Sequence, residues 1–128
     1  DIVATDFDGD GKLEILTFSK FHGDTLAIWH EGETRDRYEQ VWCDPQKRSF
    51  LHALWAAELD GEKCAVIGNR KDGRDLLLVR YVDGEYTVDV IDHDLGPANC
   101  MVYTHEGSEY IVAAYRETDQ LALYKVVE

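Results

Sequence analysis

The stretch from Ala4 to Phe18, ATDFDGDGKLEILTF, places four acidic side chains and two glycines between two apolar segments. The spacing DxDxDG is typical of a calcium loop, which in an EF-hand lies between helices and ends with a Glu at position twelve. Counted from Asp6, that position is Thr17, which has no carboxylate. The flanking segments DIVAT and LEILTF are apolar and partly β-branched, so they favour strands. The stretch therefore predicts a β-hairpin that carries an acidic loop at its turn.

The same pattern recurs twice further along the chain. Three segments align on a glycine near their start: DGKLEILTFS, DGEKCAVIGN and EGSEYIVAAY, beginning at residues 10, 60 and 106. Each has an apolar run before it and another after it. A fourth run, YEQVWCD or YTVDVID, occurs in the first two units only. Units of four strands that recur at a period in the forties are typical of β-propeller blades.

We therefore expect an all-β fold, a segment of a β-propeller with three four-stranded blades at about 1–48, 49–97 and 98–128, the last one incomplete. A β-sandwich is the rival fold, but it does not explain the recurring unit. Propellers close with about 4–8 blades, so three blades do not complete a ring. We expect the chain to associate with itself or to be one part of a longer polypeptide.

The charge of the chain excludes some classes of partner. Its formal net charge is −13, and no basic stripe is present to neutralise phosphates, which argues against nucleic acid. No apolar run approaches the roughly 18 residues that a membrane span requires. The chain begins with Asp1 and shows no signal segment, so we expect a processed or excised piece, and the compartment stays open.

Two resemblances to known proteins follow from these motifs. The run DFDGDGKLEI, followed by a strand, resembles FG-GAP/VCBS-type repeats, the calcium-loop blades of integrin-like β-propellers. The last two units, which contain HALWAAELDGEKCAVIGNRKDG and LGPANCMVYTHEGSEYIVAAYRETDQLALYKVVE, resemble the closing blades of bacterial propellers related to aldos-2-ulose dehydratase. The resemblance implies radial blades, the last one completed by a strand from the N-terminus of the full chain.

The acidic loop is the candidate metal site. A hard cation such as Ca²⁺ prefers several oxygen ligands, which a tight loop supplies. The expected ligands are the side chains of Asp6, Asp8, Asp10 and Glu14 and the backbone carbonyl of Lys12. The alternative is a solvated acidic turn without an ion.

The function expected from these features is a calcium-binding FG-GAP/VCBS-like module that serves as a binding or interaction scaffold for a protein or carbohydrate ligand. The alternative is the propeller part of a sugar-processing lyase or dehydratase, whose catalytic candidate is His52, which could pair with the thiol of Cys100. The tryptophans are expected to pack between blades, although they could also stack on a sugar. Three further histidines, His22, His30 and His93, indicate no specific site.

Overall fold

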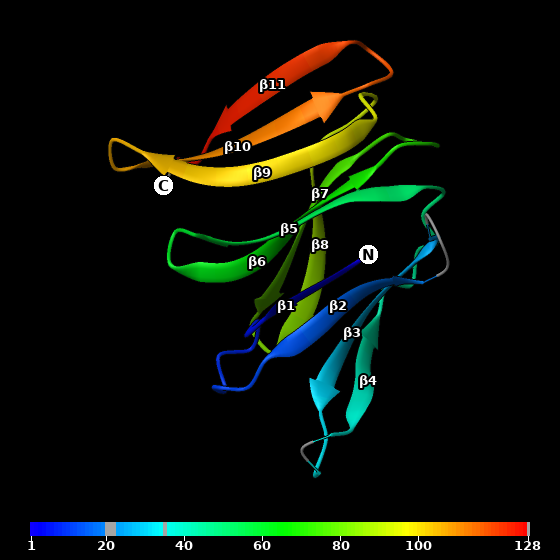
Figure 1. The fold of residues 1–128 in the computed structure, drawn as a ribbon, viewed down its shortest axis with the longest axis vertical. Coiled ribbons are helices and arrows are strands. Elements are labelled where there is room, and N and C mark those ends of the chain that lie inside the picture. Colours follow the sequence, from blue (N-terminus) through cyan, green and yellow to red (C-terminus); the bar gives the residue numbers. More distant parts are fainter. Residues whose placement is uncertain (20–22, 35, 128) are drawn as a thin grey trace.

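The computed structural model describes residues 1–19, 23–34 and 36–127, so His22 lies outside the described part. Within that part the chain forms eleven strands and no helix, arranged as three antiparallel sheets (Figure 1). The first sheet contains β1 (Ile2–Thr5), β2 (Glu14–Ser19), β3 (Thr25–Glu31) and β4 (Tyr38–Cys43). The middle sheet contains β5 (Leu51–Leu59), β6 (Glu62–Asn69), β7 (Leu76–Val82) and β8 (Glu85–Asp92). The last sheet contains β9 (Pro97–His105), β10 (Ser108–Tyr115) and β11 (Gln120–Lys125).

Every sheet is a meander in which consecutive strands pair with one another. Three of the hairpins close through two residues of positive φ: Asp60–Gly61, Asp83–Gly84 and Glu106–Gly107. Turns with this backbone match the right-handed twist of the strands that they join. The expectation of an all-β chain with two four-stranded units and a three-stranded third is confirmed.

The sheets pack face to face in series along the longest axis of the molecule, with the middle sheet between the other two (Figure 1). Odd and even positions of each strand point to opposite faces of its sheet. The middle sheet therefore packs one apolar face against the first sheet and the other against the last sheet. Between the first and middle sheets the buried side chains are those of Phe7, Leu16, Phe18, Leu26, Ile28, Leu51, Ala65, Ile67, Leu77 and Val79. Between the middle and last sheets they are those of Ala53, Val66, Leu76, Cys100, Ile111, Ala113 and Tyr115.

The first strands of successive sheets are neighbours: β1 contacts β5, and β5 contacts β9. At the second junction the backbone of Gly68 approaches the last sheet so closely that an added Cβ would lie 2.6 Å from the Pro97 carbonyl oxygen. The three sheets do not close into a ring. No helix within the described residues is long and apolar enough to cross a membrane.

Candidate metal site

The acidic loop connects β1 to β2, and its own carboxylates hold its shape. Asp6 accepts hydrogen bonds from the backbone nitrogens of Gly9 and Gly11, both at 2.9 Å. Asp10 accepts one from the backbone nitrogen of Lys12 at 2.8 Å, and Asp8 accepts one from that of Asp10 at 3.1 Å. The φ angles of Gly9 and Gly11 are +73° and +87°, which side chains rarely tolerate. The sequence DxDxDG thus produces a tight, exposed loop whose acidic side chains converge.

Glu14, the first residue of β2, lies beneath this loop and is fully buried. One carboxylate oxygen accepts a hydrogen bond from the backbone nitrogen of Asp8 at 3.0 Å, and the other accepts one from the hydroxyl of Tyr86 in the middle sheet. Burial raises the pKa of Glu14 above its ordinary value, and the Tyr86 bond partly opposes that rise. Glu14 therefore fastens the acidic loop to the neighbouring sheet.

The structure brings the expected acidic ligands together in two overlapping groups. One oxygen each of Asp6, Asp8 and Glu14 lie within 4.8 Å of one another. Asp8, Asp10 and His30 form the second group, in which one ligand atom of each residue again lies within 4.8 Å of the others. Lys12 lies in the same loop, where its backbone nitrogen is engaged by Asp10. The five positions expected from the sequence are therefore adjacent in space, and no ion is needed to explain the hydrogen bonds described above.

His30 is the residue of this site that the sequence reasoning missed. Its Nε2 atom lies 2.7 Å from Asp10 Oδ2 and 3.5 Å from Asp8 Oδ2, while Nδ1 lies 2.8 Å from the carbonyl oxygen of Glu31. The Glu31 carbonyl and then the two carboxylates raise the pKa of His30, which favours its charged form. In its charged form His30 offsets part of the negative charge of the loop.

A cleft of about 570 Å³ opens beside the loop, between the first sheet and the β7–β8 hairpin of the middle sheet. Asp8 and His30 form its polar side, and Trp42, Tyr81 and Tyr86 form its aromatic side. The ring of Tyr86 lies 6.0 Å from that of Trp42 and 4.9 Å from that of Tyr81, centre to centre. An aromatic surface next to carboxylates is suited to ligands that have both apolar and polar groups.

The catalytic candidate His52 lies at the junction of the middle and last sheets. Its Nδ1 atom is 2.6 Å from the carbonyl oxygen of Ala98, and its ring stacks on Phe50 at 5.9 Å. Cys100 is buried, its Sγ donates to the carbonyl oxygen of Val66 at 3.6 Å, and burial raises the pKa of its thiol to about 12. A thiol that stays protonated is a poor nucleophile, so this pair offers no nucleophilic centre.

The three tryptophans, two in the first sheet and one in the middle sheet, have separate environments. Trp29 donates from Nε1 to Thr17 Oγ1 at 3.0 Å on the outer face of the first sheet. Trp42 packs against the core between the first and middle sheets, as expected for a packing residue. Trp55 is 40% exposed and borders a groove on the last sheet. Only Trp42 thus combines packing with a place in the cleft beside the loop.

Comparison of the chain with protein-family models, with curated proteins and with solved structures finds no match. The resemblance to FG-GAP/VCBS repeats and to relatives of aldos-2-ulose dehydratase stays a prediction. The features that bear on function are therefore the acidic loop and the cleft beside it.

Proposed function

We propose that the chain is a calcium-binding β-propeller segment of the FG-GAP/VCBS type, which serves as a binding or interaction scaffold. The observation that carries the calcium proposal is the convergence of Asp6, Asp8 and Glu14 oxygens within 4.8 Å in a loop of fixed shape. Carboxylate and carbonyl oxygens are the ligands that Ca²⁺ prefers. Asp10 and the Lys12 carbonyl complete the proposed set.

The propeller proposal is supported by the arrangement of the sheets. Two meanders of four strands and one of three follow one another, and their first strands are neighbours. In a β-propeller the four-stranded sheets are arranged around a central channel, and the first strands of successive blades are neighbours there. Further blades, from a second copy or from the rest of a longer polypeptide, would then continue the series beyond the first and last sheets.

The scaffold is favoured over the lyase because the catalytic candidates serve other roles. His52 contacts the backbone of Ala98 across a sheet junction, and the Cys100 thiol stays protonated at neutral pH. The cleft with Trp42 and Tyr81 instead offers a surface for a protein or carbohydrate ligand next to the proposed ion. A calcium ion there would hold the loop that forms one wall of this cleft.

Calcium titration tests the proposal. Ca²⁺ that binds the folded chain at a hundred times its Kd adds about 2.7 kcal/mol to the free energy of unfolding, so the Tm should rise by several degrees. Asp8→Ala removes one proposed ligand but keeps the backbone nitrogen that donates to Glu14, and it should abolish the rise. Glu33→Ala, at an exposed acidic residue between β3 and β4, is the matched control and should keep it. Calorimetry that detects neither heat nor stabilisation in the unmodified chain would refute the calcium proposal.

A further inference from the structure

The aligned glycines identify equivalent positions in the three sheets. Leu26, Leu76 and Leu121 are equivalent, because each pairs with the residue seven positions after the aligned glycine of its unit. Leu26 is fully buried by the middle sheet, and Leu76 is fully buried by the last sheet. Leu121 occupies the same place on the last sheet and is 76% exposed. The last sheet thus carries the apolar residue of a sheet junction, and no sheet within the described part of the chain covers it.

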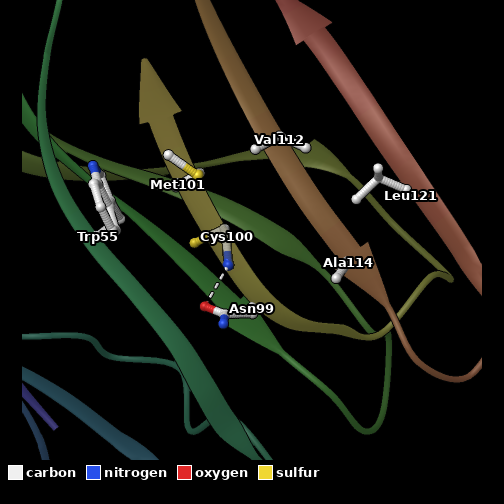
Figure 2. Close-up of a pocket in the computed structure, with 7 residues that line it drawn as sticks. All are labelled: Trp55, Asn99, Cys100, Met101, Val112, Ala114 and Leu121. Atoms are coloured by element: carbon white, nitrogen blue, oxygen red, sulfur yellow. Dashed lines mark hydrogen bonds between the residues drawn. The ribbon is translucent and has the colours of Figure 1, made fainter.

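The neighbouring positions repeat this relation. Ile28 is fully buried, whereas its equivalent Leu123 is 57% exposed. Met101 on β9 is 40% exposed on the same face. Figure 2 shows Met101, Val112 and Leu121 on three adjacent strands of this face, where they border a groove of about 260 Å³. An apolar face that continues across three strands is rarely left in water by a monomer.

The first sheet has the complementary uncovered face. Ile15 lies four residues after its glycine, as do Ala65 and Ile111, which are buried against the preceding sheet. No preceding sheet within the described residues covers Ile15, and Ile2 on the adjacent strand is 60% exposed. This face of the first sheet is therefore equivalent to the faces of the middle and last sheets that pack against Leu26 and Leu76.

We infer that a second copy of this chain docks head to tail, so that the outer face of its first sheet covers the outer face of the last sheet. The contact repeats the two sheet junctions inside the chain. In each of them, the face with the equivalent of Leu121 on one sheet packs against the face with the equivalent of Ile15 on the next sheet. It is heterologous, so it leaves a free face at each end unless the rotation closes into a ring. The inference rests on the packing of the sheets and does not depend on calcium.

Two single-face variants test this mode of association. Leu121→Lys blocks the last sheet and Ile2→Lys blocks the first, and each side chain is exposed in the single chain. In sedimentation velocity at physiological salt, which screens the repulsion between chains of net charge −13, the unmodified chain should associate at micromolar concentration. Each variant alone should be monomeric, and their mixture should form a 1:1 complex of twice the 14.6 kDa of one chain. The control Val90→Lys, at a 55% exposed valine on β8, should associate like the unmodified chain.

Several outcomes would overturn the inference. One is a monomeric unmodified chain, and another is a Leu121→Lys variant that still associates. A third is an Ile2→Lys variant that associates by itself, because this would indicate a contact between two identical faces. Hydrogen exchange on the unmodified chain gives a readout that needs no folded variant. Amides of β1 and β11 should exchange more slowly at high protein concentration than at low concentration, and equal rates would refute the docking.

Discussion

The substitution Gly68→Ala tests the close approach of the middle and last sheets. The φ of Gly68 is not in the left-handed region, so the change acts through packing alone. The added Cβ would lie 2.6 Å from the Pro97 carbonyl oxygen and 2.9 Å from Ala53 Cβ, well inside the 3.4 Å at which ordinary contact begins. Because these neighbours are a backbone oxygen and a short side chain, they cannot rotate away. The two sheets must separate locally or β9 must shift.

Overpacking of this kind costs about 1–3 kcal/mol, as in other close-packed interiors. Alanine also lowers the conformational entropy of the unfolded chain, which offsets about 0.4–1 kcal/mol of this loss. A net loss of about 1–2 kcal/mol should lower the Tm by roughly 3–10 °C for a chain of this length. Urea unfolding should show a lower midpoint with an unchanged m value.

The matched control for this experiment is Gly32→Ala. Its added Cβ meets its nearest neighbour, the Arg37 carbonyl oxygen, at 3.2 Å, so the free energy of unfolding should change by about 0.5 kcal/mol or less. If Gly68→Ala is as stable as the unmodified chain, the sheets are not as close as described. An equal loss in both variants would mean that the effect is not specific to the sheet junction.

Two further predictions concern buried side chains. Tyr86→Phe removes the hydroxyl that donates to the buried carboxylate of Glu14, so the free energy of unfolding in urea should fall by about 1.5–3 kcal/mol; a loss below about 0.5 kcal/mol would contradict that role. In mass spectrometry after brief treatment with iodoacetamide, exposed Cys43 should be alkylated in the folded chain. Cys64 and Cys100 should react only after unfolding, because burial raises the pKa values of their thiols to about 11 and about 12. Equal labelling of all three at neutral pH would show that the core opens readily.

The strands could be predicted from the sequence because their signals are local. Glycines at hairpin turns and apolar alternation after them depend only on neighbouring residues, so β2, β6 and β10 follow from the aligned segments. The acidic loop was recognisable for the same reason. The order in which the sheets pack depends on which apolar face of each sheet contacts its neighbour. That could be seen only in the three-dimensional structure.

The remaining parts of the site arise from contacts between distant residues. Glu14 and Tyr86 are 72 positions apart and meet only because the first and middle sheets pack together. His30 had a usable signal, since extending the pairing of Leu16 with Ile28 along β2 and β3 places His30 opposite Glu14, next to the loop. The position of His30 beside the aspartates could therefore have been predicted from the pairing register of the two strands.

The acidic loop differs in length from the other turns that begin each unit. The hairpins β5–β6 and β9–β10 close in two residues, whereas the residues between Thr5 and Glu14 form an eight-residue loop. Phe7 lies between two aspartates of that loop, yet its side chain is 6% exposed and belongs to the core between the first and middle sheets. The loop therefore cannot be exchanged for a short Asp-Gly turn without taking an aromatic ring out of the core. An ion bound by the aspartates would act on a segment that is anchored in the interior near its first residue, so ion binding and the cohesion of two sheets would depend on one piece of backbone.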